Sequence, residues 1–541
     1  MSASESIFAL AKYFVYLLIP YLLLLSAYRI FLHPLRRYPG PWLAKVTDAY
    51  GPVYRQGPNR LVFNTATALR DIYNNERVGK SFVYTLLVGA KTSPNVFNCL
   101  NKSLHRTKRK VIGQAVTERA TRLFEPTLQQ QVDIFIEQLR SSKEPMDITP
   151  RLRWVGLDTI GLLAFGFEFN VQRDPKHRFV LDGIFAGNFK SNCLFQFPLL
   201  YDLGLENLLA SISGRSRKRF FALLEQMTSS RLGQGKHARN DLVSFVAEGA
   251  QGAAMNDAKL RELLFSEGIF FLAAGGDTTA AATAALFFYI TRKINSETYK
   301  KLANEIRTTF SSAAEIHSGP KLSGCHYLRA CIDEAMRMAP PVPGIPWRQL
   351  AEDDPQKGQP LIIDGHLIPP GTQVGVSMYA LHHNEKYFPE PYRFQPERWL
   401  SENEAQVATM RSAFAPFSIG SRSCAGKAMA YLEASLVISK TIWHFDFEAA
   451  PGELGRVGGG TTGRVDGRGR PDEYQLLDLD AAPVITSSDA ARRAISDVQH
   501  RHVDLQTSAG AVAQQHGLAV RGFRMRDLSQ PLDHHPRGPA A

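Results

Sequence analysis

Cysteine is scarce in this chain of 541 residues, which contains only five. Their number is odd, they are scattered from Cys99 to Cys424, and no two of them form a C-x-x-C pair. This pattern argues against a disulfide framework and a cysteine zinc site, and it favours a reducing compartment. The hydrophobic share of 44% and the aromatic share of 10% are large enough for a substantial core, so the composition is not that of a disordered protein.

Motifs of several other protein classes are absent as well. The sequence has no H-E-x-x-H zinc-protease motif and no G-x-S-x-G hydrolase motif. The glycine-rich stretch 455–469 lacks the lysine and the following helix of a phosphate-binding loop, so we expect a surface hairpin or loop there. The net charge of +12 suggests anionic partners, but no basic run interleaved with aromatic residues indicates nucleic acid. Anionic lipid or an acidic redox protein fits this charge better.

One long apolar run lies near the N-terminus. Phe14–Ala27 is almost unbroken apolar sequence, and with its flanks the run is long enough to span a bilayer. Arginines follow at positions 29, 36 and 37, so the positive-inside rule predicts a single-pass anchor with the downstream chain in the cytoplasm. A cleavable signal peptide is the alternative, although the cysteine usage argues against secretion. The proline-rich segment after the span predicts a stiff hinge.

The setting of one cysteine stands out. Residues 417–426 read FSIGSRSCAG, so Cys424 lies between a turn-forming stretch and an apolar-periodic segment, Lys427–Trp443, that predicts a helix. A sulfur at a helix N-terminus faces unpaired backbone N–H groups and the positive end of the helix dipole, and both favour the thiolate. The flanking glycines would let a flat macrocycle approach the backbone. These properties suit a haem iron; the alternative is an inert buried cysteine.

A second segment departs from local rules inside its best apolar stretch. The sequence AGGDTT, residues 274–279, interrupts the apolar run Leu263–Ile290, which is long enough for a buried helix of about seven turns. Two glycines in a helix interior cost about 1 kcal/mol each, and a buried acid and hydroxyls need partners. Such a conflict indicates a functional site. The alternative is a core helix that merely contains threonines.

With both segments in view, the chain resembles the cytochrome P450 superfamily of haem-thiolate monooxygenases, most closely its microsomal fungal members. Residues 417–426 fit the family's haem-binding signature F-x-x-G-x-R-x-C-x-G at every fixed position, and three further motifs occur in the family's order. The resemblance covers roughly residues 33–480. It implies a mainly α-helical haem domain with small β-sheets that binds heme b, with Cys424 as the axial thiolate ligand of the iron.

The resemblance implies roles for the AGGDTT segment. Thr278 matches the hydroxyl beside the bound oxygen, and Asp277 matches the acid that relays protons. Gly275 and Gly276 match a widened helical turn that admits dioxygen. Asp277 and Thr278 are therefore the expected catalytic residues.

A structural triad is implied further along the chain. Glu334 and Arg337 lie three residues apart in a predicted helix, Leu328–Met338, and alone such a pair is usually a solvated surface bridge. They match the family's E-x-x-R pair, which closes with an arginine of a downstream P-E-R motif. Here that arginine is Arg398, with Arg393 as the alternative. The triad is expected to fix the fold around the cysteine loop.

Further contacts to the cofactor and substrate follow from the resemblance. His105 stands where the family often has the tryptophan of W-x-x-x-R, and its spacing to Arg109 places both on one helix face, where an imidazole N–H can bind a propionate. A solvated basic face is the alternative. Arg422 and Arg348 are the other propionate candidates, because arginine binds carboxylates well. The expected cofactor-binding set is Phe417, Gly420, Arg422, Gly426, His105, Arg109 and Arg348, and the expected substrate pocket includes Phe270, Ala274, Gly275 and Val342.

The implied activity is monooxygenation of a lipophilic small molecule in fungal secondary-metabolite biosynthesis. It requires dioxygen and electrons from an NADPH-dependent cytochrome reductase, at the endoplasmic reticulum membrane. One alternative is a haem-thiolate enzyme that rearranges peroxides or dehydrates its substrate without external electrons. Another is a non-catalytic haem-binding membrane protein or an inactive paralogue.

The domain boundaries expected from these patterns divide the chain into four parts. Residues 1–30 form a luminal N-terminus and an anchor, 31–48 a hinge, 49–480 the haem domain, and 481–541 a tail whose composition favours disorder. Only seven residues separate Trp42 from Tyr50, so a helix that the family usually carries there is expected to be missing.

Overall fold

The computed structural model describes most of the predicted haem domain. The described residues are 51–88, 93–142, 146–205, 214–234, 241–244, 257–352, 354, 356, 358–460, 470–475 and 519–525, with a few isolated positions before residue 51. They form two compact units, residues 1–81 with 345–377, and residues 82–344 with 378–541. The predicted anchor and hinge lie almost wholly outside the described residues, as does the short segment after Trp42.

The first unit is built on a five-stranded sheet. The strand order is β1 (Val53–Gly57), β2 (Arg60–Phe63), β8 (Gln373–Val376), β5 (Arg348–Leu350) and β3 (Val78–Lys80). Strands β2 and β8 pair in parallel, and both are buried along their whole length. Runs of this kind, rich in Val, Leu and Phe, are typical of strands covered on both faces.

Among the residues that the structure describes from position 51 on, the first unit also contains a hairpin and a helix. The hairpin joins β6 (Leu361–Ile363) to β7 (His366–Ile368) through Asp364 and Gly365. Both turn residues have positive φ, which a two-residue type I′ turn requires. The helix α3 (Ala66–Tyr73) begins after Thr65, whose side chain accepts a hydrogen bond from the Ala68 N–H.

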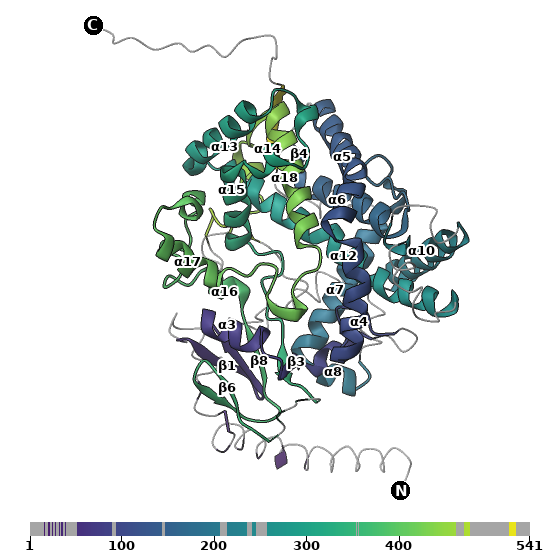
Figure 1. Ribbon diagram of the computed structural model, residues 1–541, viewed down its shortest axis with the longest axis vertical. Coiled ribbons are helices and arrows are strands. Elements are labelled where there is room, and N and C mark those ends of the chain that lie inside the picture. Colours follow the sequence, from purple (N-terminus) through teal and green to yellow (C-terminus); the bar gives the residue numbers. More distant parts are fainter. Residues whose placement is uncertain are drawn as a thin grey trace. The chain divides into compact units, whose positions relative to one another are not determined.

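The second unit is mainly helical, with one small sheet and several short 3-10 helices (Figure 1). Its α-helices are α4 (Lys102–Ala115), α5 (Glu118–Ser141), α6 (Ile148–Phe165), α7 (Phe179–Gln196), α8 (Leu199–Asp202), α10 (Gly214–Gly233), α12 (Asp257–Ile290), α13 (Ser296–Thr309), α14 (Pro320–Ser323), α15 (His326–Met338), α16 (Met378–His382), α17 (Glu404–Ala413) and α18 (Lys427–His444). Its 3-10 helices are η2 (Phe82–Leu87), η3 (Pro175–His177), η4 (Lys293–Asn295), η5 (Ala313–Glu315), η6 (Pro396–Leu400), η7 (Gly420–Arg422) and η8 (Gly452–Arg456). The predicted mainly α-helical class with small sheets is thus confirmed.

Helix α12 is the central element of this unit. It contacts α6, α10, α15 and α18, which lie around it in Figure 1. Its last seven residues, from Ala284 to Ile290, are fully buried in a core shared with α5, α15 and α18. Among the described residues it is the one helix long and apolar enough to cross a membrane, but 56% of its most apolar stretch is buried inside the protein. Its apolar character therefore fits a core helix, as the sequence predicted for Leu263–Ile290.

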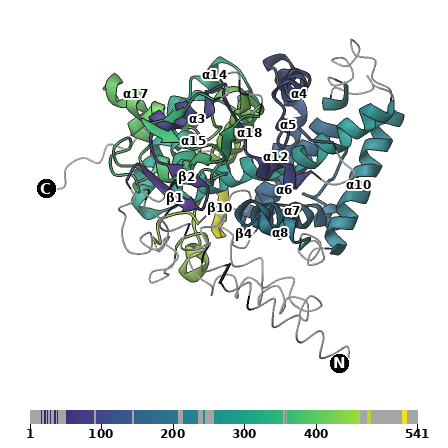
Figure 2. The same cartoon turned by 90° about the horizontal axis from the view of Figure 1, so that it is seen from below.

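The small sheet of the second unit contains a strand that the sequence did not predict. Residues Ala519–Met525 form β10, which pairs with β9 (Phe445–Ala449) and β4 (Met146–Asp147), all antiparallel. In Figure 2 the yellow strand β10 lies beside β4. These seven residues depart from the disorder expected for 481–541, because strand pairing satisfies backbone groups whatever the side-chain composition. The other residues of that tail lie outside the described part of the chain.

Candidate functional site

The loop that carries Cys424 has a defined backbone geometry. The Cys424 N–H donates a hydrogen bond of 2.9 Å to the carbonyl oxygen of Phe417. Ser418 and Gly420 have φ of +55° and +76°, and the left-handed region is open to glycine at little cost. Gly426 ends the loop, and α18 begins at the next residue, as predicted.

The setting of Cys424 differs from that of the other cysteines. Cys424 is the one exposed cysteine among the five, while Cys99, Cys325 and Cys331 are buried. Protein atoms still surround the thiol closely enough for desolvation to raise its pKa. The Gly426 backbone and the charges of Arg109 and Lys427 lower the pKa in opposition to this effect. A cysteine with positive groups beside it is suited to bind a metal ion as thiolate.

Two of the predicted propionate-binding arginines converge on this loop. Arg109 donates from its Nη1 to the carbonyl oxygen of Ser423 at 2.6 Å. Arg422 donates to the carbonyl oxygens of Cys99 and Leu100, at 2.7 and 3.0 Å. Through Arg109 the loop is joined to α4, and through Arg422 it is joined to the residues just before α4.

The remaining predicted cofactor contacts lie in different surroundings. His105 is buried on α4, one turn before Arg109. The ring of Phe417 is half-buried and packs against that of Tyr431, with 5.1 Å between the centroids. Arg348 lies in β5 of the first unit, where its Nη1 donates to the carbonyl oxygens of Pro346 and Trp347, so its contact with a propionate stays a prediction.

The side chains of Asp277 and Thr278 have different partners. The carboxylate of Asp277 forms an ion pair with Arg153 of α6, with 2.8 Å from Oδ1 to Nε. The Thr278 hydroxyl donates to the carbonyl oxygen of Ala274 at 2.7 Å. Sequence reasoning missed Arg153, because no local pattern connects residues more than one hundred positions apart.

Gly275 and Gly276 lie where α12 packs against α6. A Cβ added at Gly275 would lie 2.7 Å from the side chain of Ile160, and one added at Gly156 would lie 2.7 Å from the carbonyl oxygen of Gly276. The helix continues as regular α-helix through both glycines. Close helix packing is therefore one reason for these glycines, and the widened turn stays a prediction.

The predicted triad residues lie together in the core. Arg337 donates from Nε and Nη2 to the two carboxylate oxygens of Glu334, at 2.9 Å each. Arg398 donates from Nε to Glu334 Oε1 at 3.1 Å, and Trp399 donates to Oε2 at 3.0 Å. All three charged side chains are buried. The side chain of Arg393, by contrast, is exposed and pairs with Glu390, so Arg398 is the third member.

Aromatic side chains gather around one predicted pocket residue. The ring of Phe270 stacks on that of Phe97, with 5.0 Å between the centroids and 10° between the planes. Tyr84 contacts Phe97 and also Phe195 of α7. Val342, in the loop after α15, is exposed.

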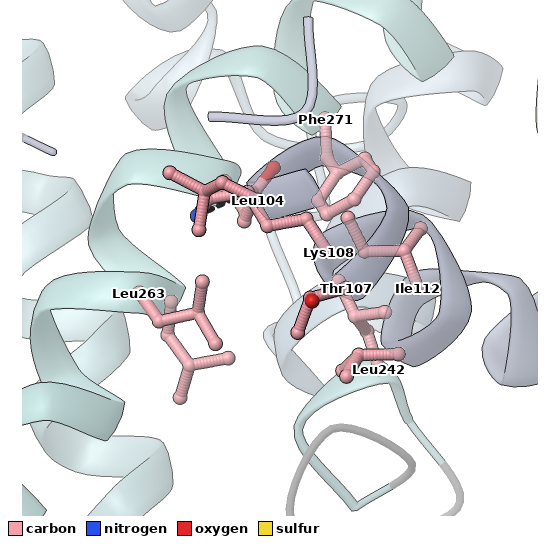
Figure 3. A pocket seen from close by; sticks show the side chains of 10 residues that line it. Leu104, Thr107, Lys108, Ile112, Leu242, Leu263 and Phe271 are labelled. Carbon is pink, nitrogen blue, oxygen red and sulfur yellow. Dashed lines mark hydrogen bonds and ion pairs between the residues drawn. The ribbon is translucent and has the colours of Figure 1, made fainter. Parts of the chain in front are cut away.

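A cavity of about 180 Å³ lies between α4 and the first half of α12. Figure 3 shows the side chains of Leu104, Leu263 and Leu242 around it. Its wall is apolar except for Thr107 and the ion pair of Lys108 with Glu267, at 3.0 Å. None of the four predicted pocket residues lines it, although Phe271, the neighbour of Phe270, does.

The donor set fits a haem. The exposed residue Cys424 could supply a thiolate ligand, and the guanidinium groups of Arg109 and Arg422 flank its loop, where carboxylate groups could bind. Gly426 leaves space beside the sulfur, since a Cβ there would lie 4.0 Å from Sγ. Within the described residues no group of three or more His, Cys, Asp or Glu side chains offers another metal site.

The family model for cytochrome P450 matches residues 39–455 of this sequence. The chain belongs to the cytochrome P450 family. Among similar proteins, the cytochrome P450 monooxygenase AKT7 of Alternaria alternata is 33% identical over 496 residues, which cover 85% of this chain and 93% of the relative. The cytochrome P450 monooxygenase poxM of Penicillium oxalicum is 34% identical over 463 residues, covering 80% of this chain and 88% of the relative.

The predicted family, enzyme class and cofactor are thereby confirmed. The protein is a P450 monooxygenase, and its family binds heme b through an axial cysteine thiolate. P450 monooxygenases use dioxygen, a substrate and electrons from a redox partner. Cys424 is the cysteine of this chain that stands in the haem-binding signature.

Proposed function

We propose that this P450 oxidises a lipophilic small molecule in fungal secondary-metabolite biosynthesis, with electrons from an NADPH-dependent cytochrome reductase. The observation that carries the proposal is the exposed residue Cys424 in a loop flanked by Arg109 and Arg422. This is a thiolate ligand with two anion-binding groups beside it. The related enzymes of Alternaria and Penicillium support the fungal setting.

In this proposal the residues around the cysteine loop hold the cofactor. Cys424 binds the iron, and Arg109, Arg422 and the buried His105 bind the propionates, with Arg348 as a further candidate. The bound haem supplies the activation of dioxygen, for which a thiolate ligand favours O–O cleavage. The protein contributes the axial ligand, the path for protons and the substrate pocket.

Asp277 and Thr278 deliver protons in this scheme. The Asp277 side chain is 31% exposed, so its carboxylate can exchange protons with solvent while Arg153 holds it in place. The Thr278 hydroxyl directs its own proton to the Ala274 carbonyl oxygen, which leaves the oxygen lone pairs free to accept a hydrogen bond. A solvent-linked acid beside an accepting hydroxyl is a suitable pair for moving protons.

The substrate is proposed to be lipophilic because the groups along the expected pocket are apolar. Phe270, Ala274 and Thr278 follow one another at four-residue spacing and therefore share a face of α12. The stacked ring of Phe97 extends this face, and Tyr84 extends it further. Burying an apolar substrate against a surface of this kind makes the free energy of binding more favourable.

The proposed location is the endoplasmic reticulum membrane. Residues 1–30 would supply a luminal N-terminus and one anchor helix, and the arginines at positions 29, 36 and 37 would hold the haem domain on the cytoplasmic side. A lipophilic substrate could then enter from the bilayer.

Labelled dioxygen tests the proposed reaction. Microsomes that contain the full chain and a reductase should form product from candidate substrates only with NADPH, and the product should carry one atom of ¹⁸O. Cys424→Ala should form none. Product that forms without NADPH, or without the label, would contradict the proposal and indicate rearrangement or dehydration.

A further inference from the structure

The segment before α4 is fastened to the first half of α12 by two neighbouring residues of that helix. The Val96 N–H donates to both carboxylate oxygens of Glu267, at 3.1 Å to Oε1 and 2.9 Å to Oε2. Asn95 donates from its side-chain amide to the carbonyl oxygen of Ser266 at 3.2 Å. The segment therefore has two anchor points within one turn of α12.

The carboxylate of Glu267 also belongs to a buried ion pair. The ammonium group of Lys108 on α4 donates to Glu267 Oε1 at 3.0 Å, and the two side chains are 8% and 3% exposed. Burial raises the pKa of Glu267, while the Lys108 charge and the Val96 N–H oppose this shift. Glu267 thus joins three parts of the chain: α12, α4 and the segment before α4.

Hydrogen bonds within the segment fix its local shape. The side-chain oxygen of Asn95 accepts from the N–H groups of Phe97 and Asn98, both at 3.0 Å. The side-chain oxygen of Asn98 accepts in turn from the Asn95 N–H at 2.7 Å. Asn95 and Asn98 are both buried, so water does not compete for these bonds. Phe97 is therefore placed wherever Val96 is held.

A second contact with α12 lies directly beside the first. Phe97 follows Val96, and Phe270 follows Glu267 at a spacing of three residues, which makes these two residues of α12 neighbours on the helix surface. The rings of Phe97 and Phe270 stack at 5.0 Å. Both are half-buried, so part of each ring is open to other apolar groups. The Val96–Glu267 contact thus sets where the Phe97 ring lies on the face that leads to Thr278.

We propose that Glu267 is a positioning residue that sets the preference of the pocket for apolar groups: through the Val96 N–H it holds Phe97 against Phe270. This inference rests on the proposed function, in which that face of α12 lines the substrate pocket. Glu267 touches neither substrate nor cofactor in this scheme. Lys108 compensates its charge and keeps the carboxylate in place.

The cavity between α4 and α12 borders this ion pair. Lys108 and Glu267 line it together with apolar side chains, among them Leu263 and Phe271 (Figure 3). On this side the Glu267 side chain is not held by close packing, which elsewhere fixes side chains in a core. The bonds to Lys108 and to the Val96 N–H must therefore hold the carboxylate.

Two double variants separate the hydrogen bond from the charges. Glu267→Gln with Lys108→Met keeps an oxygen that can accept from the Val96 N–H, whereas Glu267→Met with Lys108→Met does not. Both remove the two charges together, so neither leaves an unpaired charge in the core.

Hydrogen exchange of the purified holoprotein tests whether Glu267 holds the segment. In the wild type, the peptide with residues 93–100 should be protected from exchange. It should exchange about tenfold faster in the double variant with Glu267→Met, in the range expected from losing one buried hydrogen bond, and as in the wild type in that with Glu267→Gln. Equal exchange in both double variants, or a wild type without protection, would overturn the proposal.

Imidazole and 4-phenylimidazole test the consequence for the pocket. Both bind a haem iron through a ring nitrogen and shift the Soret band, but only the second carries a phenyl ring that can contact Phe97 and Phe270. The preference for 4-phenylimidazole, taken as the ratio of the two dissociation constants, should fall about fivefold in the double variant with Glu267→Met. It should stay at the wild-type value in the double variant with Glu267→Gln.

A Phe97→Ala background tests whether Glu267 acts through Phe97. With the ring removed, the two double variants should show the same preference, because the effects of residues that act as one unit do not add. A fivefold difference that persists in this background would overturn the proposal.

These outcomes are separable from failure of the proposed function. A wild type that lacks NADPH-dependent product would contradict the proposed function, while the exchange of residues 93–100 would still decide whether Glu267 holds the segment. A wild type that binds imidazole and 4-phenylimidazole equally well would overturn the role of Glu267 in the pocket.

Discussion

Gly156 of α6 and Gly276 of α12 pack backbone against backbone. An ideal Cβ at Gly156 would lie 2.7 Å from the carbonyl oxygen of Gly276, closer than real contacts allow. The contact lies next to Asp277, whose carboxylate pairs with Arg153 three residues before Gly156. Close packing of the two helices and the position of the acid are therefore parts of one interface.

Gly156→Ala should destabilise the protein by about 1–3 kcal/mol, because the new methyl group forces α6 and α12 apart. Gly187→Ala in α7 is the matched control, since a Cβ there meets no atom within 4 Å. Denaturant unfolding should show the loss in the first variant and none in the second. A Gly156→Ala variant as stable as the wild type would contradict the packing described.

Arg398→Ala should destabilise the fold by about 3–5 kcal/mol, because it leaves part of the buried charge of Glu334 uncompensated. When Arg398→Ala is expressed in cells, the yield of haem-loaded protein should therefore be low. Arg393→Ala removes an exposed pair with Glu390 and should change the free energy of unfolding by less than about 1 kcal/mol. Equal yields and equal stability of both variants would refute a structural triad.

Asp277→Asn should reduce the rate of product formation about 100-fold, in the range of lost general acid–base catalysis. The haem spectrum should stay unchanged, because the Asp277 side chain is paired with Arg153 on α6. Arg153→Gln serves as control for the ion pair, whose partly exposed groups contribute less than about 1 kcal/mol to stability. Unchanged turnover of Asp277→Asn would show that protons follow another path.

The stability of the protein should depend on pH through Glu433. Burial raises the pKa of Glu433 from 4.5 to about 7 in the folded state. The unfolded chain therefore releases this proton first, and the contribution of Glu433 to stability is complete below pH 4.5 and is lost as the pH rises to about 7. The loss amounts to about 3 kcal/mol at 1.36 kcal/mol per pKa unit.

Glu433→Gln should lack this loss, because its amide does not titrate. The difference in free energy of unfolding between wild type and variant should shift in favour of the variant between pH 5 and pH 7, as measured by denaturant titration at each pH. A constant difference across this range would mean that Glu433 does not titrate with a raised pKa.

The parts of the structure that the sequence predicted well are those with a strong local pattern. Helix α18 begins at Lys427, as expected, because loop glycines and a turn precede an apolar-periodic run. Helix α15 ends at Met338, before two prolines. Glu334 and Arg337 lie three residues apart in that helix, so helical spacing alone was enough to predict their ion pair.

Contacts between distant segments could not be predicted in this way. Arg153 and Asp277 meet only because α6 packs on α12, and no pattern in either helix shows it. Strand β10 has the composition of a tail, yet β4 and β9 provide the partners that make it a strand. Sequence reasoning also missed Glu433, an acid in the mostly apolar middle of α18. Such an acid must find a partner or keep its proton.

The most direct test of a haem-thiolate site at Cys424 is the reduced, carbon-monoxide difference spectrum of the full chain in microsomes, recorded beside Cys424→Ala. With Cys424 as the axial ligand, the wild type should show a long-wavelength thiolate Soret band, the Cys424→Ala variant should lack it, and Cys99→Ala should retain it. A band that survives in Cys424→Ala, or a wild type without any such band, would contradict the assignment of Cys424 as the axial ligand.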